Sequence, residues 1–299
     1  MTTEVLIRDR LRQPRLKRLR RFAQIMRRAP KVPTLIIVTF VILAVFADWI
    51  APMSPYDQNI PNRLQPPGIL AGTANWLGTD ALGRDVLTRL IFGARVTLTI
   101  SIAAIAIGQG IGLTLGVTSG FFGGWYDKVV MRIVDGAMSI PGIFLALLLA
   151  VVLGPSFTTV IIAIGLVLWS RFVRTLRAET MKIKEAEFVK LARVAGCSNR
   201  WIIVRHIFPN LVNLWAVLVS LEVGFTVIVE ASLGFLGAGV PPPTPSWGSL
   251  ISDGRQYVTS AWWLSFFPGL AILLVVLSVN LFGDWLRDVL DPQMRQKAT

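Results

Sequence analysis

Cysteine and histidine are almost absent from this sequence of 299 residues, which contains only Cys197 and His206. A single cysteine cannot form a disulfide within one chain, and one residue of each type cannot build a Cys/His zinc site. The nucleotide-binding stretch G-x-x-x-x-G-K-[ST] does not occur either. The sequence therefore predicts no disulfide framework, no metal ligands, no catalytic residues and no ATP hydrolysis by this chain.

Charge is also scarce in this sequence. Charged residues make up 16% of the chain, whereas soluble domains carry about 25%, and the mean hydropathy is +0.62. Residues 96–126, 136–170 and 256–283 contain no charged side chain, and about 20 apolar residues suffice to cross a bilayer as a helix. We predict an all-α polytopic membrane protein with six transmembrane helices. The predicted spans are residues 34–51, 95–119, 134–153, 157–173, 211–236 and 263–284.

Lysine and arginine are distributed unevenly between the predicted loops. With a cytoplasmic N-terminus, the inside segments hold 25 of the 30 basic residues and the outside segments hold five. Cytoplasmic loops carry such an excess, so both termini are predicted to be inside. The net charge of +13 then reflects topology and contact with anionic membrane lipid. Nucleic-acid binding is not expected, because aromatic residues hardly interleave with the basic ones. The predicted parts are a basic cytoplasmic tail (1–33), a first transmembrane helix (34–51), an external loop (52–94), a five-helix core (95–284) with a cytoplasmic loop (174–210), and a cytoplasmic C-terminal tail (285–299).

The external loop is expected to be irregular at first and helical at its end. Prolines at positions 52, 55, 61, 66 and 67 disfavour regular structure. In the following stretch, "LGTDALGRDVLTRLIFGARVTL", Thr79 or Asp80 can cap a helix. We predict a short amphipathic helix here, at the outer surface and separate from the span that begins at residue 95. Its apolar face would consist of Val86, Leu87, Leu90 and Ile91.

A stripe of glycines runs along the second predicted span. Gly108, Gly112, Gly116 and Gly120 are spaced by four residues, which places them on one helix face, where small residues let two backbones approach closely. The neighbouring helix could belong to this chain or to a partner subunit, in which case the stripe would line a translocation path. The sequence leaves both interpretations open.

Two acidic residues lie within an apolar run of the fifth predicted span. Glu222 and Glu230 are separated by eight residues, about 80° of helix rotation, so both could face one cavity. An acid at this depth can make an interhelical hydrogen bond or stay protonated. Alternatively, it can contact a cationic or amine-bearing solute on a translocation path. A stand-alone secondary carrier would also use these acids, but no clear internal repeat supports that class. An intramembrane enzyme is not favoured either, because His206 has no evident Ser or Asp partner.

The polar and basic stretch "EAEFVKLARVAGCSNRWIIVRHIFPN", residues 185–210, is patterned like two helices. Gly196 is a stop for the first helix, Ser198 can cap the second, and Pro209 is expected to end it. A unit of this size must rest its apolar face on the membrane surface or in a groove of a cytoplasmic partner, and the residues alone favour neither. The apolar stripe consists of Phe188, Leu191, Ala192 and Ala195, with Glu187, Lys190 and Arg193 outside it.

The same stretch resembles the EAA loop of ABC-importer permeases. Ala192, Gly196 and Pro209 are in register with the alanine, glycine and proline of that motif, whereas Lys190 and His206 replace a glutamate and an isoleucine. Three further stretches, "LGTDALGRDVLTRLIFGARVTL", "RIVDGAMSIP" and "EASLGFLGAGVPPPTPSWGSLI", are similar to the C-type permease subunit of dipeptide, oligopeptide and nickel ABC importers. The resemblance assigns Glu187, Lys190, Ala192, Arg193, Gly196, Ser198, His206 and Pro209 to an ATPase-coupling loop, and Asp80, Gly83, Arg84 and Asp85 to an external motif.

The resemblance implies a type I ABC-importer permease fold and a non-enzymatic subunit of the bacterial cytoplasmic (inner) membrane. Its expected partners are a second homologous permease, two ATPase subunits, an extracytoplasmic solute-binding protein and membrane lipid. ATP and Mg²⁺ would be bound by the ATPase subunits, and this chain would hold no cofactor. The expected solutes are di- and oligopeptides or related molecules. Candidates for the translocation path are Glu222, Glu230, Gly108, Gly112 and Gly116.

Overall fold

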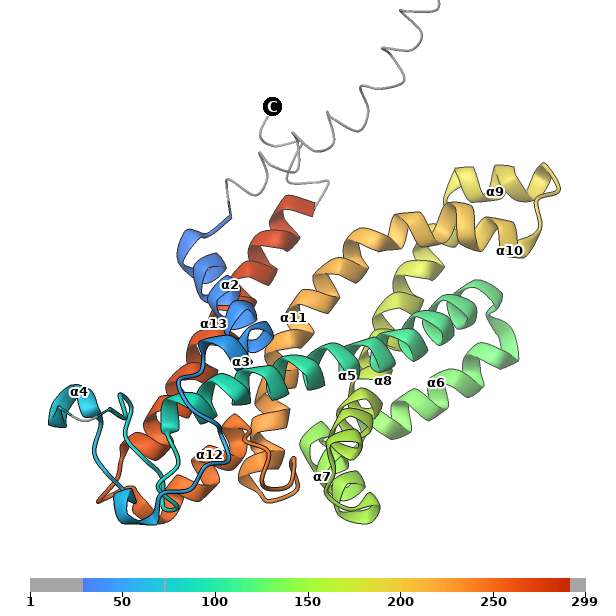
Figure 1. Cartoon of the computed structure of the whole chain (residues 1–299). Coiled ribbons are helices and arrows are strands. Elements are labelled where there is room, and N and C mark those ends of the chain that lie inside the picture. The colour runs from blue at the N-terminus through green and yellow to red at the C-terminus, as the bar shows by residue number, and fades with distance from the viewer. Residues whose placement is uncertain (1–28, 73, 291–299) are drawn as a thin grey trace, which may run out of the picture.

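The computed structural model describes residues 29–72 and 74–290, and this part of the chain is mostly helical (Figure 1). Most of the predicted basic tail and the end of the C-terminal tail lie outside the described residues. Within the described ranges no strand forms, and Thr79 and Asp85 make one isolated antiparallel bridge. The all-α prediction is therefore confirmed for these ranges.

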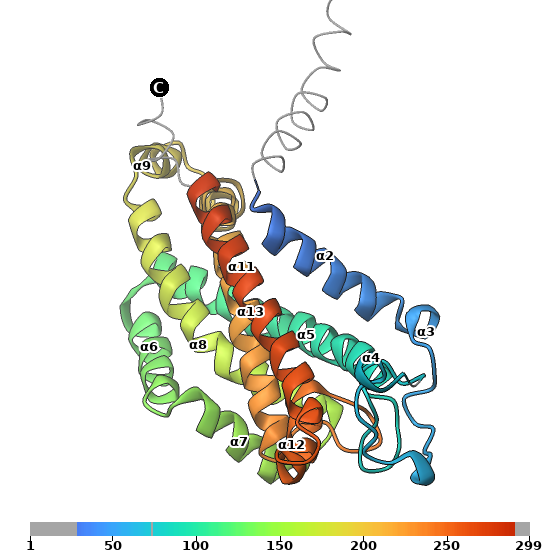
Figure 2. The ribbon, with the colours of Figure 1, turned by 90° about the vertical axis from the view of Figure 1, so that its left-hand side faces the viewer.

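The long helices cross one another as rods, with short helices at both ends of the molecule (Figures 1 and 2). The segment before the core contains α2 (Lys31–Val45), α3 (Ala47–Ile50), the 3₁₀ turn η1 (Ile60–Asn62) and α4 (Gly68–Ala71). The core contains α5 (Val86–Phe122), α6 (Gly124–Met138), α7 (Gly142–Leu153), α8 (Phe157–Lys184), α11 (Phe208–Phe235) and α13 (Trp263–Leu290). At one end lie α9 (Glu187–Val194), α10 (Asn199–Ile202) and the π-helical turn η2 (Ile203–Ile207), and at the other end lie α12 (Trp247–Gly254) and the 3₁₀ turn η3 (Arg255–Tyr257).

Four helical runs in the described part of the chain are long and apolar enough to cross a bilayer. These are α5, α8, α13 and the continuous run Asn199–Phe235, and α6 with α7 is a fifth candidate. The apolar helix α2 has 15 residues, about 22 Å at 1.5 Å per residue, whereas the hydrocarbon core is about 30 Å thick. A membrane protein with several helical spans is therefore supported, and the count of six and the orientation of the termini stay predictions.

The third predicted span, residues 134–153, is not one straight helix. It divides into α6 and α7, which meet at 86°. The break lies at Pro141, because proline lacks a backbone N–H and its ring disfavours helical geometry at the preceding residue. Ion pairs from Asp127 to Arg177 and from Asp135 to Arg174 hold α6 against α8.

The predicted amphipathic helix before the second span is not a separate element. Residues 86–91 form the first turns of α5, which continues without a break to Phe122. The cap is Asp85, and neither Thr79 nor Asp80: the Asp85 carboxylate accepts the Thr88 backbone N–H at 2.8 Å. No proline interrupts the following residues, and the only early glycine, Gly93, is buried in the helix. Backbone hydrogen bonding can therefore pass directly from the capped turn into the span.

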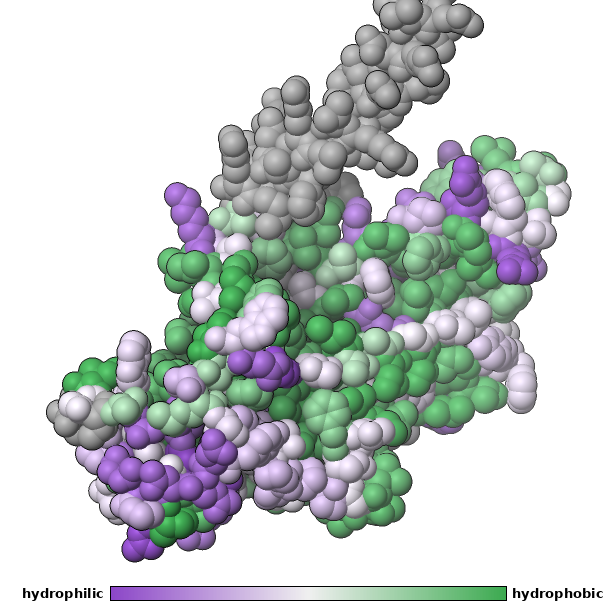
Figure 3. Space-filling view, viewed as in Figure 1, coloured by the Kyte–Doolittle hydropathy of each residue, from purple (hydrophilic) through white to green (hydrophobic). Residues whose placement is uncertain are grey.

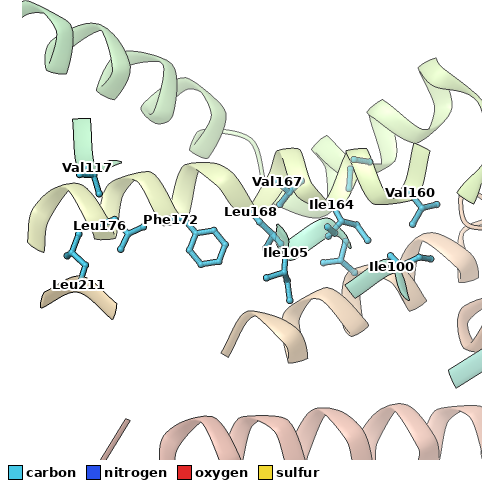
Figure 4. Packing of buried hydrophobic residues seen from close by; sticks show 14 of the residues in the cluster. Ile100, Ile105, Val117, Val160, Ile164, Val167, Leu168, Phe172, Leu176 and Leu211 are labelled. Carbon is cyan, nitrogen blue, oxygen red and sulfur yellow. The ribbon is translucent and has the colours of Figure 1, made fainter. Parts of the chain in front are cut away.

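The glycine stripe of α5 packs closely against α8 of the same chain. A Cβ at Gly108 would lie 2.7 Å from Leu168 Cβ, and one at Gly112 would lie 2.3 Å from Phe172 Cβ. Figure 4 shows Leu168 and Phe172 on α8, within the same apolar cluster as residues of α5. The internal-packing interpretation thus describes the stripe, and its assignment to a path between subunits is corrected. The other two glycines, Gly116 and Gly120, meet backbone oxygens of α8 at 2.9 and 2.8 Å.

Candidate functional site

Helices α9 and α10 form a hairpin that projects from one end of the long helices (Figure 1). Gly196 has φ +78°, which is the left-handed conformation that glycine adopts readily. Its N–H donates to Arg193 O, and the N–H of Cys197 donates to Ala192 O, both at 3.0 Å. This pair of bonds is the Schellman ending of a helix. Ser198 then accepts the N–H of Trp201 at 3.3 Å, so both predicted hairpin signals act as expected.

The hairpin buries one face and exposes another. Val189 and Ala192 are buried in the apolar cluster that also contains residues of α8 and α11. On the other side, Leu191 is 68% exposed and Val194 is 87% exposed. The predicted stripe is therefore split, because Ala192 faces this chain while Leu191 and the exposed Phe188 face outward. The space-filling view shows apolar surface at this end of the molecule (Figure 3).

Pro209 does not end the second helix of the hairpin, contrary to the prediction. It lies in the first turn of α11, directly after the π-helical turn η2. A proline ring clashes with the carbonyl four residues earlier in regular α-helix and supplies no N–H. The wider π-helical turn occurs at the position where that clash would arise. Consequently α10, η2 and α11 form one continuous 37-residue run, Asn199–Phe235.

The remaining hairpin side chains make local contacts. Lys190, which replaces a glutamate of the motif, lies 3.4 Å from Glu185 Oε2 through its Nζ. The Arg193 guanidinium lies over the Phe121 ring at 5.4 Å, which connects the hairpin to the end of α5. Glu187 begins α9, where an acidic side chain complements the helix dipole. The ring of His206 packs against aromatic rings at 4.9 and 5.8 Å, those of Trp201 and Phe188.

The external motif forms a buried ion cluster at the end opposite the hairpin. Asp80 Oδ2 accepts hydrogen bonds from Arg84 Nε at 2.7 Å and from Arg89 Nη1 at 2.5 Å. All three side chains are buried. Asp253 of α12 lies 3.6 Å from Arg89 Nη1. Because each buried charge has a partner of opposite sign, the cluster ties this loop to α5 and α12.

Gly83 and Asp85 of the same motif shape the loop around this cluster. Gly83 has φ +74°, and a Cβ there would lie 1.8 Å from Asn59 O. Asp85 accepts a second hydrogen bond at 3.0 Å from Asn75 Nδ2. The indole of Trp263, on α13, donates to Thr79 O at 3.2 Å. These contacts together hold the external loop onto α5, α12 and α13.

The two acids of the fifth predicted span, Glu222 and Glu230, differ in burial and in their partners. Glu230 is fully buried, and its Oε2 accepts from Thr97 Oγ1 of α5 at 3.1 Å. The interhelical hydrogen bond thus describes Glu230, and its assignment to a path is corrected. Glu222 is less enclosed and lies 4.0 Å from Arg171 Nη1 of α8. The Arg171 guanidinium also lies over the Phe225 ring at 4.2 Å, so this arginine and Glu222 are the charged pair at that level of the core.

Sequence patterns missed three charged residues in these clusters. Arg89 and Asp253 belong to the external cluster, and Arg171 pairs with Glu222. The spacing of four between Asp80 and Arg84 is a signal for a pair on neighbouring turns. Arg89 follows Asp80 by only nine residues, but Asp80 precedes the helix that carries Arg89, so no helical spacing indicates this pair. Asp253 and Arg171 come from helices that are far from their partners in the sequence.

The protein-family comparison identifies the core of the chain. Residues 112–296 match the family described as "Binding-protein-dependent transport system inner membrane component". The chain belongs to this family. Residues 34–67 match a second description, "N-terminal TM domain of oligopeptide transport permease C". The resemblance to C-type permeases is thereby confirmed, and this family member is a multi-pass inner-membrane component of a transport system.

Curated relatives match this family member over most of their length. The chain is 41% identical over 266 residues to the dipeptide transport system permease protein DppC of Alkalihalophilus pseudofirmus, which covers 88% of this chain and 86% of that protein. It is 38% identical to a putative peptide transport system permease protein of Brucella suis, covering 90% and 89%. It is 37% identical to the glutathione transport system permease protein GsiD of Escherichia coli, covering 96% and 93%.

A solved structure has a related fold. It is an inward-facing MetNI methionine ABC transporter, matched with a TM-score of 0.56 over 68% of this chain and 96% of that chain. At 19% sequence identity, this similarity supports the fold of an ABC-importer permease and nothing about the solute.

Proposed function

We propose that this chain is one of two permease subunits of an ATP-driven importer for di- or oligopeptides or related solutes. The observation that carries the proposal is the α9–α10 hairpin, whose apolar face is exposed at one end of the molecule. The names of the relatives, which refer to dipeptide, peptide and glutathione transport, support the solute class. ATP is hydrolysed on two separate ATPase subunits, and an extracytoplasmic binding protein delivers the solute.

The hairpin is suited to transmit force between the ATPase subunits and the spans. An exposed apolar helix face fits a hydrophobic groove on a partner protein. Val189 and Ala192 fix α9 to the core, and the Schellman turn fixes the angle between the two hairpin helices. Because α10 continues without a break into α11, a displacement of the docked hairpin moves the helix that carries Glu222. The proposed consequence is rocking of the core helices as the ATPase subunits close.

In this proposal the chain crosses the membrane six times with both termini in the cytoplasm. The hairpin then faces the cytoplasm, and the external ion cluster faces the binding protein. The translocation path lies between the two permeases and includes the pair of Arg171 and Glu222. A charge of each sign at one level suits a solute that carries both an ammonium and a carboxylate. The glycine stripe and Glu230 have no part in this path, because they pack within the chain.

The decisive experiment places a charge on the proposed docking face. In Val194→Glu we expect normal membrane insertion, little or no co-purified ATPase, and loss of peptide uptake. Val258→Glu is the matched control, because Val258 is also exposed but belongs to the opposite end of the molecule, directly after η3. We expect V258E to recruit ATPase like the wild-type chain. Recruitment and uptake at wild-type levels in V194E would refute the docking role of the hairpin.

A further inference from the structure

A large apolar cleft lies beside α2, distant in the fold from the hairpin. Its volume is about 730 Å³, and its walls come from α2, α5 and α13, with contributions from α12 and the external loop. Among the lining side chains, only Thr39 and Asp85 are hydroxyl or carboxyl groups. The Asp85 carboxylate is already occupied by two hydrogen bonds, and the indole N–H of Trp247 donates to Leu90 O at 2.9 Å. The cleft is therefore chemically suited to a hydrocarbon and poorly suited to a polar solute.

The cleft is open to the surroundings of the protein. Several residues of its wall are accessible; Leu35 is 66% exposed, Ile50 is 42% exposed and Leu274 is 39% exposed. Its volume lies within the range of about 300–1,000 Å³ that is typical of ligand sites. In a bilayer, an apolar opening of this kind is filled by hydrocarbon, because water gains no hydrogen bonds there.

The dimensions of the cleft fit a lipid chain. On the N-terminal side, its wall includes Leu35 to Leu43 of α2, about 12 Å of helix, and continues through Ile50 of α3 and Pro52. One leaflet contributes about half of the hydrocarbon thickness of about 30 Å, so this wall can follow most of an acyl chain that extends through one leaflet. At the end beside the external loop lies Trp76, which is mostly exposed. Tryptophan is enriched at the boundary between hydrocarbon and headgroups, which places the headgroup at this end.

Helix α2 contacts the core through few specific interactions. The Phe40 ring packs against Trp247 at 5.4 Å, and Arg95 Nε donates to Ala44 O at 2.9 Å. Arg95 also pairs with Asp48 at 2.9 Å. The first two contacts join α2 to the core at its middle and its C-terminal end, the Asp48 pair joins the following helix α3 to α5, and the cleft lies alongside them.

We propose that the cleft binds an acyl chain of a membrane phospholipid from the leaflet beside the external loop. The chain fills the space between α2 and the wall formed by α5 and α13, and the headgroup lies near Trp76. The bound lipid thereby completes the packing of α2 against the core. This site is separate from the solute path and from the anionic lipid contact expected for the N-terminal tail.

Photo-crosslinking of lipid in the assembled importer tests this site. The importer is placed in nanodiscs of phosphatidylethanolamine and phosphatidylglycerol with a trace of phosphatidylcholine that carries a diazirine near the end of one acyl chain. After illumination, adducts are mapped by peptide mass spectrometry. We expect adducts on cleft residues such as Leu43 and Leu274, in excess of those on the outward face of α2. Adducts confined to the outward face would show ordinary boundary lipid and would overturn the proposal.

Variants with a tryptophan in the cleft provide a matched comparison for the lipid crosslinking experiment. Ala271→Trp places an indole in the wall formed by α13, and we expect cleft adducts to fall at least several-fold. Val38→Trp adds the same side chain to an exposed position of α2 outside the cleft and should leave the cleft adducts unchanged. If A271W does not fold, Leu43→Trp fills the cleft from the opposite wall. Equal cleft adducts in the filled and control variants, or lipid adducts on a partner subunit in place of the cleft residues, would refute the acyl-chain site.

Discussion

Replacing Gly112 by alanine should separate α5 from α8, and the structure allows the size of this effect to be worked out. The added Cβ would lie 2.3 Å from Phe172 Cβ, whereas carbon atoms prefer about 3.5–4.0 Å. The two helices must therefore separate by about 1.2 Å locally, or Phe172 must leave its position. Overpacking of this kind costs about 1–3 kcal/mol. Alanine also favours the helix by about 1 kcal/mol relative to glycine, so the two effects oppose each other.

Gly110 is the control that isolates the overpacking cost. It lies two residues earlier on the same helix, and a Cβ there would meet no atom within 4 Å. Gly110→Ala should therefore show only the gain in helix propensity. Because that gain is shared by both variants, the difference in unfolding free energy between G112A and G110A should be about 1–3 kcal/mol, with G112A less stable.

The assay is reversible unfolding of both variants in the same detergent, followed by helix content. Gly116→Ala provides a graded point, since its closest contact is longer, 2.9 Å to Val173 O, and its loss should be smaller than that of G112A. The packing account of the glycine stripe would be refuted if G112A were as stable as G110A.

Two further predictions concern the charged clusters. Asp80→Asn leaves two buried arginines without their shared carboxylate and should destabilise the folded chain by about 3–5 kcal/mol; the mostly exposed Asp253 is the control, and D253N should cost much less in the same unfolding assay. Comparable losses in the two variants would refute the assignment of Asp80 as the centre of the cluster. Glu222→Gln should reduce solute-stimulated transport several-fold while the permease and ATPase subunits still co-purify, because the proposed path loses its acidic group next to Arg171. Loss of assembly in E222Q would instead identify Glu222 as a packing residue.

The hairpin shows how far local patterns reach. Gly196 and Ser198 marked the end of one helix and the start of the next, and the structure has both. Such signals are readable because capping depends on residues within a few positions of each other. Pro209 shows the limit, since the π-helical turn η2 lets the helix continue through a residue that normally ends it.

The clusters of charge required the tertiary structure. Glu222 and Glu230 belong to the same helix and have similar surroundings in the sequence. In the structure, however, Glu230 accepts a hydrogen bond from Thr97 of α5, whereas Glu222 lies beside Arg171 of α8. Likewise, nothing near Asp80 in the sequence indicates that Asp253 lies beside its arginine partner.

The sequence by itself determined that this chain is an all-helical membrane protein, that it belongs with the C-type permeases, and where the hairpin turns. The membrane class follows from composition and charge distribution, and the hairpin turn follows from capping residues, all of which act locally or sum along the chain. The similarity to the C-type permeases follows from the resemblance of its motifs to that family. Only the tertiary structure decided that the glycines of α5 pack against α8, that Glu230 is buried and accepts a hydrogen bond from Thr97, and that an apolar cleft lies beside α2. Each of these depends on which helices meet, and that choice arises from packing between residues that are distant in the sequence.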